Sequence, residues 1–195
     1  MRALSASLVA IVVFTVVLGF GYPALMAGVG AVAFAGKSNG SLIHRNGTVV
    51  GSALAAQAFT SPRYFHERPS ATSPAYNAAG TTFSNLGPTN PALAKLVSQN
   101  AQAVLELERP YNPGLTIAQI PVDAVVPSGS GIDPHITPAY AQLQARRIAA
   151  VRRLPLATVQ GQIDRNTADR VLGFFGEPGV NVLKLNLALD SLGGK

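Results

Sequence analysis

Residues 4–34 read LSASLVAIVVFTVVLGFGYPALMAGVGAVAF, and this stretch decides how the rest of the chain is interpreted. No side chain between Arg2 and Lys37 carries a formal charge, and most of them are Leu, Val, Ile, Phe or Ala. A helix needs about 20 apolar residues to cross the hydrocarbon core of a bilayer. We therefore predict a transmembrane anchor at residues 1–35, followed by one soluble domain at residues 36–195.

Pro23 lies inside the apolar stretch and has no backbone N–H to donate. It is expected to kink or end the helix near Gly21, which places the membrane-crossing core at residues 7–25 and an interfacial extension at residues 26–35. Gly19 and Gly21 allow a neighbouring helix to approach closely. These two glycines and Pro23 are candidate docking positions within the membrane, and plain lipid contact is the alternative.

A cleaved signal peptide is the main alternative to an anchor, because Ala33 and Ala35 form a small-x-small pattern ahead of Gly36. Signal peptides have an apolar region of roughly 7–15 residues, and the present one is about twice as long. This length favours an uncleaved anchor. Arg2 and Lys37 lie on opposite sides of the stretch, so charge alone leaves both orientations open.

The composition limits the chemistry of the soluble part. The chain has no cysteine, so it forms no disulfide and no thiolate metal site. Its net charge of +6 would suit nucleic acid, but the basic residues are scattered apart from one cluster at residues 146–153, and no aromatic side chains alternate with them. Binding of nucleic acid needs a basic stripe, so we expect no nucleic-acid partner.

Residues 36–195 are expected to fold as a single mixed α+β domain. Asn46-Gly47 between two β-prone stretches predicts a hairpin. A capping residue followed by proline predicts helices that begin at Pro91 and Pro138 and end near residues 110 and 153. The other expected elements are short helical pieces at 156–163 and 168–172, an edge strand at 116–126, a half-buried strand at 183–190 and a long ordered loop at 60–88.

No catalytic constellation is evident in the sequence. It contains no phosphate-binding P-loop, no His-Glu-x-x-His and no Gly-x-Ser-x-Gly elbow. His66-Glu67 and Asp133-Pro134-His135 are the only segments that could meet as a metal site, and turns are the simpler interpretation of both. We therefore expect no catalytic residue, no metal and no cofactor bound by a recognisable motif.

Seven short segments, in order along the chain, carry a family resemblance. They are NGSLI (39–43), GS (51–52) with Gln57 and Phe59, YFH (64–66) with RPSAT (68–72), YN (76–77), SNL (84–86), SGIDPHI (130–136), and VNVL (180–183) running into LNLALD (185–190). With these segments the chain resembles the C subunit of the bacterial Kdp potassium-transporting P-type ATPase. Glu67 and residues 79–82 depart from the family pattern, which leaves the geometry of the 60–88 loop open.

The resemblance implies a non-catalytic accessory subunit of a high-affinity, ATP-driven potassium uptake complex in the bacterial inner membrane. The implied partners are a channel-like potassium-binding subunit, an ATP-hydrolysing subunit and a small subunit. The implied role is that of a catalytic chaperone, which raises the affinity of the ATPase subunit for ATP. ATP would then be bound only in a ternary complex with that subunit. The resemblance also implies a single span with an extracytoplasmic domain, and a freestanding anchored extracytoplasmic hydrolase or binding protein is the alternative.

The candidate contact residues combine aromatic or charged side chains with tight turns, as interface anchors do. Ordinary loop packing is the alternative for each of them. They are Tyr64, Phe65, His66, Arg68, Gly131, Asp133 and His135. If the domain instead faces the cytoplasm, four arginines become candidates for contact with phosphate, although stabilisation of their own helix terminus would also explain them. These are Arg146, Arg147, Arg152 and Arg153.

Overall fold

The computed structural model describes residues 2–193 and divides the chain into two compact units that meet between Val50 and Gly51. The first unit contains the apolar stretch and the residues that follow it up to Val50. The second unit contains the remaining residues and has its own hydrophobic core. The fold is thus an apolar N-terminal helix followed by a mixed α+β domain, as the sequence predicts.

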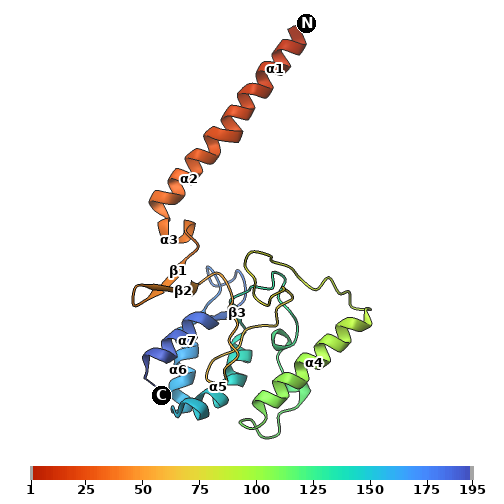
Figure 1. Cartoon of the computed structure of the whole chain (residues 1–195), viewed down its shortest axis with the longest axis vertical. Coiled ribbons are helices and arrows are strands. Elements are labelled where there is room, and N and C mark those ends of the chain that lie inside the picture. Colours follow the sequence, from red (N-terminus) through yellow and green to blue (C-terminus); the bar gives the residue numbers. More distant parts are fainter. Residues whose placement is uncertain (1, 194–195) are drawn as a thin grey trace. The chain divides into compact units, whose positions relative to one another are not determined.

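The apolar stretch forms one long helix that runs from Arg2 to Ala33, a span of 32 residues. It consists of α1 (Arg2–Phe14), the π-helical segment η1 (Thr15–Gly21) and α2 (Tyr22–Ala33), as Figure 1 shows. At 1.5 Å per residue it is about 48 Å long, which exceeds the hydrocarbon core of a bilayer. None of its residues is buried within the structure, so it has the surface of a helix that needs an apolar environment.

Pro23 does not end the helix, so of the two predicted effects near Gly21, a kink or an end, the end is wrong. The helix widens just before the proline, where the Tyr22 N–H donates to the carbonyl oxygen of Val17, five residues earlier. A local π-turn can absorb the hydrogen bond that a proline removes. The helix therefore continues to Ala33, and residues 26–33 are part of it.

The predicted hairpin follows the short helix α3 (Ala35–Ser38). Strands β1 (Leu42–Arg45) and β2 (Thr48–Ser52) pair with each other in a two-stranded sheet. Asn46 and Gly47 both have positive φ angles, of 51° and 78°, as the central residues of a type I′ turn require. The hairpin is confirmed.

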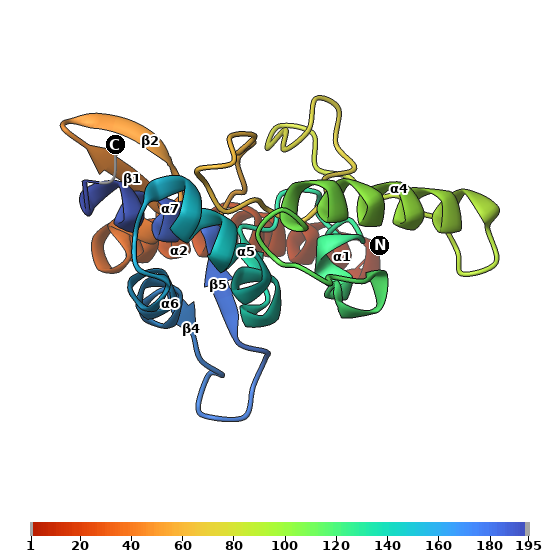
Figure 2. The same ribbon diagram turned by 90° about the horizontal axis from the view of Figure 1, so that it is seen from below.

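In the part of the second unit that the structure describes, α-helices pack on one another and against a small sheet (Figure 2). Helix α4 (Pro91–Glu108) begins after the Asn90 cap, and α5 (Pro138–Arg152) begins after the Thr137 cap, both as predicted. Helix α6 (Leu156–Arg165) is also confirmed. The antiparallel sheet has the strand order β3-β5-β4 and pairs Ile136 and Thr167 with Val180. Its strands are β3 (His135–Ile136), β4 (Thr167–Ala168) and β5 (Gly179–Asn181).

Residues 182–191 form the helix α7 (Val182–Ser191), so the predicted strand at 183–190 is wrong. The buried positions include Val182, Leu185, Asn186 and Leu189, which lie three and four residues apart, on one face of a helix. The alternation of leucines was misleading because the segment contains few β-branched residues. The Asn181 side chain caps the helix by accepting a hydrogen bond from the Lys184 N–H at 3.0 Å.

Two further segments differ from their predicted structures. Residues 116–126 form the 3₁₀ turns η2 (Ile117–Gln119) and η3 (Val122–Ala124) instead of an edge strand. A side chain supplies a hydrogen-bond partner for the backbone here, because Gln119 Oε1 accepts a hydrogen bond from the Thr116 N–H at 2.9 Å. Residues 168–172 are not helical, because they end β4 and enter the turn that leads to β5.

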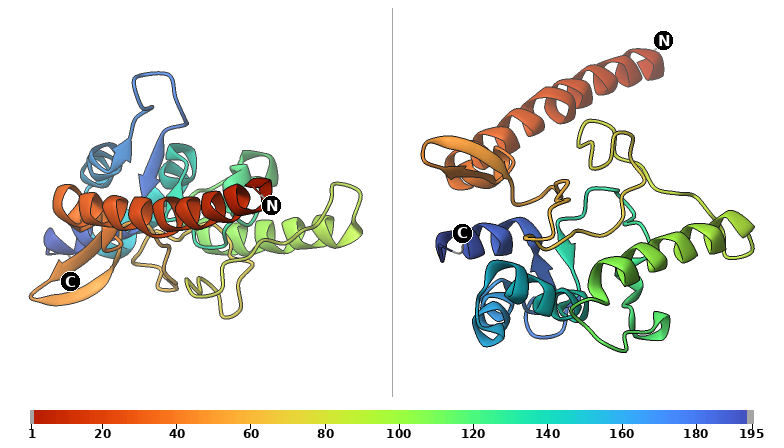
Figure 3. Two further views of the ribbon diagram at one scale, coloured as in Figure 1. Left: turned by 90° about the horizontal axis from the view of Figure 1, so that it is seen from above. Right: turned by 60° about the horizontal axis from the view of Figure 1, so that its bottom comes forward.

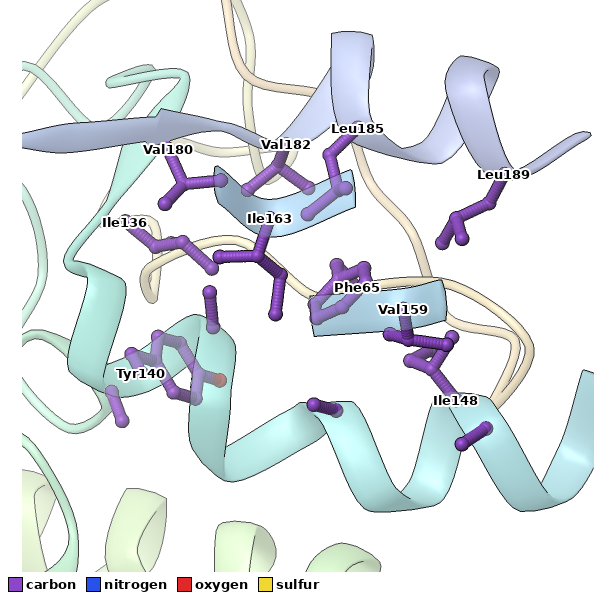
Figure 4. Close-up of a cluster of buried hydrophobic side chains, with 14 of the residues drawn as sticks. Phe65, Ile136, Tyr140, Ile148, Val159, Ile163, Val180, Val182, Leu185 and Leu189 are labelled. Carbon is purple, nitrogen blue, oxygen red and sulfur yellow. The ribbon is translucent and has the colours of Figure 1, made fainter. Parts of the chain in front are cut away.

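The core of the second unit lies where α5, α6, α7 and the sheet meet (Figure 4). Phe65, which comes from the long loop between β2 and α4, is fully buried among the side chains of these elements. The loop therefore contributes to the core, although residues 60–88 contain no helix or strand. Figure 3 shows its path beside α4.

Candidate interaction site

Three of the candidate contact residues, Tyr64, Phe65 and His66, lie in a stretch of loop that the helices hold by its backbone. This stretch, Pro62–His66, is called the clamped segment below. Polar side chains from α5 and α7 form hydrogen bonds with its peptide groups. These polar side chains lie inside an otherwise apolar core. Loops carry binding residues best when a rigid scaffold positions them, and the clamp supplies such a scaffold.

Two buried amide side chains bind the clamped segment in the way that a neighbouring strand would. Asn186 Oδ1 accepts from the Phe65 N–H at 2.8 Å, and its Nδ2 donates to the Phe65 carbonyl at 3.0 Å. Gln144 does the same for His66, with distances of 2.7 and 3.1 Å. Each amide therefore satisfies both polar groups of one residue. This is the requirement for burying loop backbone.

Two arginines complete the clamp. Arg147 donates to the carbonyls of Pro62 and Tyr64 and forms an ion pair with Glu108 Oε1 at 2.8 Å. Arg152 donates to the carbonyl of Arg63 at 2.7 Å and to Asp190 Oδ1 at 2.9 Å. Its guanidinium also lies 5.0 Å from the centre of the Tyr64 ring, a cation–π distance.

The environment of these buried groups shifts two pKa values. Burial raises the pKa of Glu108, and the charge and hydrogen bond of Arg147 oppose that rise. Burial lowers the pKa of His66, and the nearby Arg147 charge lowers it further. A buried charge must be paired to be tolerated, and Arg147 and Glu108 serve each other in this way.

The four arginines divide into two pairs. Arg147 and Arg152 are buried, with exposures of 0% and 2%, and bind the chain's own carbonyls and carboxylates. They are not available for contact with phosphate in this structure, which corrects that expectation for these two residues. Arg146 and Arg153 are exposed. Position on the helix decides the difference, because Arg147 and Arg152 face the core and the other two face away from it.

Arg68, Asp133 and His135 form a partly exposed polar cluster beside the clamped segment. Arg68 Nη1 lies 3.4 Å from Asp133 Oδ2, and the His135 N–H donates to Asp133 Oδ1 at 3.0 Å. The hydrogen bond from the His135 side chain is the main cause that lowers the pKa of Asp133, and the Arg68 charge adds to it. Arg68 and Asp133 therefore present opposite charges near the surface, and His135 adds a polar ring beside them, as interface residues do.

Gly131 fixes the approach of two loops. Its φ angle is +72°, and a Cβ at this position would lie 2.6 Å from Thr72 Cγ2 and 2.8 Å from the Thr82 carbonyl oxygen. Ser70 donates a hydrogen bond to the Gly131 carbonyl at 2.6 Å. Only glycine fits here, so Gly131 shapes the site instead of contacting a partner through a side chain.

Glu67 is buried behind the polar cluster, with an exposure of 4%. Burial raises its pKa to about 8, the Asp133 charge also raises it, and the backbone of Gln57 opposes the rise. Glu67 and Asp133 thus lie near each other, as the sequence-based metal hypothesis supposed. Within residues 2–193, however, no group of three or more His, Asp or Glu side chains is arranged to hold a metal ion.

The candidate positions of the anchor lie on the exposed helix surface. A Cβ at Gly19 would come no closer than 3.8 Å to Thr15, and one at Gly21 no closer than 3.6 Å to the Val16 carbonyl oxygen. The helix itself therefore does not need glycine at either position. Pro23 lies one turn beyond Gly19, at the start of α2.

Sequence reasoning missed the residues that build the site. Gln144 and Asn186 were not recognised, because a single polar residue on an apolar helix face does not show in the sequence whether its side chain has a hydrogen-bonding role. For Asn186 the error in secondary structure added to this, since a strand would have turned it outward. The signal that was present is the position of both amides on the buried faces of their helices.

Comparisons with known proteins give one consistent result. The family model described as KdpC, the c chain of the K⁺-transporting ATPase, matches residues 4–191. The chain is 50% identical to the potassium-transporting ATPase KdpC subunit of Methylococcus capsulatus, over 95% of this chain and 96% of that one. The KdpC subunits of Sorangium cellulosum and Mycobacterium tuberculosis are 49% and 46% identical, over 96% and 98% of this chain and 96% and 99% of theirs.

Proposed function

This chain belongs to the KdpC family of K⁺-transporting ATPase subunits, and from that premise we propose that it assembles with the other subunits and raises the affinity of the ATPase subunit for ATP. KdpC is an accessory subunit of the Kdp ATPase complex and not the catalytic one. The observation that carries the proposal is the match over residues 4–191, because it includes both the apolar helix and the soluble unit. A hydrolase domain that merely shared an anchor would match only in part.

In this proposal the helix Arg2–Ala33 is a single transmembrane span in the bacterial inner membrane, with the soluble unit on the extracytoplasmic side. The length and the exposed apolar surface of the helix support the span. The partners are the channel-like potassium-binding subunit, the ATP-hydrolysing subunit and a small subunit. Gly19, Gly21 and Pro23 are the positions at which partner helices dock within the membrane, and Arg68, Asp133 and His135 contact a partner outside it.

An extracytoplasmic domain cannot touch ATP in the cytoplasm. Its effect on ATP affinity must therefore pass through a partner with two conformations, which the accessory subunit stabilises unequally. Direct contact with ATP, in a ternary complex, is the second candidate and requires a cytoplasmic domain. In that case Arg146 and Arg153 are the arginines that are free to approach a phosphate, since Arg147 and Arg152 are buried.

Cysteine labelling distinguishes the two orientations, because the natural chain has no cysteine. Ser98→Cys introduces a thiol on the exposed face of α4, and Ala3→Cys places one at the opposite end of the apolar helix from the soluble unit. With an impermeant thiol reagent on intact spheroplasts, S98C is expected to react and A3C to react only after lysis. The reverse pattern would contradict an extracytoplasmic domain.

Assembly is tested by affinity purification of a tagged ATP-hydrolysing subunit from membranes in mild detergent. The full-length wild-type chain is expected to be retained with it in a fixed ratio. A chain that is never retained, although it is present in the membrane, would contradict the proposed function.

A further inference from the structure

An apolar tip projects from the second unit between β4 and β5, as Figures 2 and 3 show. It consists of Val171, Leu172, Phe174 and Phe175, whose exposures are 67%, 79%, 63% and 58%. Val171 and Phe175 pair across the hairpin through two hydrogen bonds of 2.9 Å. A large apolar side chain that remains in water contributes no hydrophobic free energy to folding. The stability of the second unit therefore does not explain why four such side chains lie together in the tip.

The backbone at the end of the tip is strained in a way that favours a different residue. Leu172 has a φ of 55° and Gly173 a φ of 80°, and the Phe174 N–H donates to the Val171 carbonyl at 3.3 Å. This is a type I′ turn, whose first central position prefers Asn, Asp or Gly. A leucine in the left-handed region costs roughly 1 kcal/mol. Leu172 is thus unfavourable in two ways, because its backbone is in the left-handed region and its apolar side chain is exposed to water. Backbone strain of this kind is found at functional sites.

The tip is ordered before any partner binds. The Phe174 and Phe175 rings lie with their centroids 4.1 Å apart, and an ion pair of 2.6 Å between Arg170 and Glu177 closes the base of the hairpin. Rigid aromatic side chains lose little conformational freedom on binding, so they contribute strongly to interfaces. A small, rigid, apolar projection fits a recess on another protein.

We propose that this tip inserts into an apolar recess of another subunit of the same transport complex. The proposal rests on the proposed function, which brings the other subunits next to this chain. Two cations and three anions lie between Asp164 and Glu177, so no positive excess draws the tip to anionic lipid. A second copy of the chain is also a poor partner, because a stable interface buries about 1,200–2,000 Å² and the four side chains of the tip are too small to supply that area. A subunit that is already held by the rest of the complex needs only a local contact.

The test compares tip variants with a control in the full-length chain. The double variant F174S/F175S is expected to lower retention on the tagged ATP-hydrolysing subunit about tenfold, which corresponds to about 1.4 kcal/mol. Val122→Ser is the matched control, because Val122 is 73% exposed but lies in η3, away from the tip. It is expected to be retained like the wild type.

Leu172→Gly separates binding from folding. Glycine accepts the left-handed backbone, so the thermal midpoint of the isolated chain in detergent is expected to stay the same or rise, while retention falls several-fold. Wild-type retention of both L172G and F174S/F175S would overturn the proposal and leave the proposed function intact. If the wild-type chain itself is not retained, the proposed function fails and this inference fails with it.

A bilayer contact is distinguished by fluorescence, because the chain has no tryptophan. Phe174→Trp introduces a single indole at the tip. The difference in emission between complexes that contain the F174W chain and complexes that contain the wild-type chain, both reconstituted with brominated lipids, is expected to lie at short wavelength and to show no quenching by bromine. Quenching in the complex would show that the tip lies in lipid and would overturn the proposal.

Discussion

The clamped segment and the apolar tip use side chains in opposite ways. In the clamp, charged and amide groups are buried and every one of them binds loop backbone or an opposite charge. In the tip, large apolar groups are exposed on a backbone that suits other residues better. Contacts within the chain explain why the polar residues of the clamp are buried. No contact within residues 2–193 explains why the apolar residues of the tip are exposed, and in our proposal a partner covers them. This contrast separates residues that build the domain from residues that serve the complex.

The largest expected effect comes from breaking the ion pair of the clamp. Arg147→Met leaves Glu108 buried without its partner and removes the donors to the carbonyls of Pro62 and Tyr64. Loss of one partner of a buried pair costs about 3–5 kcal/mol of unfolding free energy. Urea unfolding of the full chain in detergent measures this loss.

Arg146→Met is the matched control, because Arg146 is the exposed neighbour on the same helix. It is expected to change stability by less than about 0.5 kcal/mol. Equal effects of R147M and R146M would contradict the role of the clamp.

Glu67 gives the second largest effect, and it depends on pH. Its pKa is about 8 in the fold, against an ordinary value of 4.5. Because the folded state binds this proton more tightly than the unfolded state, protonation of Glu67 stabilises the fold. This contribution to the unfolding free energy is fully present below pH 4.5 and is lost as the pH rises through 8. Between pH 6 and pH 9 the wild type is expected to lose about 2–3 kcal/mol more than Glu67→Gln does. A constant difference between the two unfolding curves across this range would show that Glu67 is ionised in the fold.

Asn186 tests the clamp without removing a charge. Asn186→Leu fills a similar volume but leaves the N–H and C=O of Phe65 without partners, which costs about 1–3 kcal/mol. Asn100→Leu serves as a comparison, because the Asn100 side chain donates a hydrogen bond to one backbone group, the Val125 carbonyl, at 2.8 Å. Its thermal midpoint is expected to fall less than that of N186L, and a larger fall would contradict the special role of Asn186.

The smallest effect is expected at the tip. Leu172→Gly relieves the left-handed strain, so the isolated chain is expected to gain up to about 1 kcal/mol, less the cost of glycine flexibility in the unfolded chain. Chemical unfolding of L172G beside the wild type measures the change. A loss of more than about 1 kcal/mol would mean that Leu172 packs within the domain.

The sequence alone was sufficient to predict some elements of the fold and not others. The long apolar helix, the hairpin at Asn46-Gly47 and the capped helices at Pro91 and Pro138 were predictable, because each depends on local chemistry. Helix α7 was not, since its alternating leucines satisfied the pattern of a strand while its buried face has the spacing of a helix.

Whether the candidate contact residues meet a partner stays a prediction, but the structure shows how they lie relative to one another. The segment around Tyr64 and the turn at Gly131 do lie close to each other, and the Arg68–Asp133 pair joins them. The burial of Phe65, Arg147 and Arg152 could not be predicted, because it depends on contacts between residues more than 80 positions apart. No local pattern reports such contacts. The tip at Leu172 was mistaken for a helix for a different reason: its turn is held by local hydrogen bonds between Val171 and Phe175, but Leu172 is not a residue that such a turn favours.

The central claim is that a chain without ATP chemistry of its own changes how its partner uses ATP. ATP hydrolysis by the reconstituted transport complex, measured against ATP concentration with and without this chain, tests it most directly. We predict that the wild-type chain lowers the KM for ATP, whereas a clamp-broken R147M chain has a weaker effect. An unchanged KM in a complex that retains the chain would contradict the account.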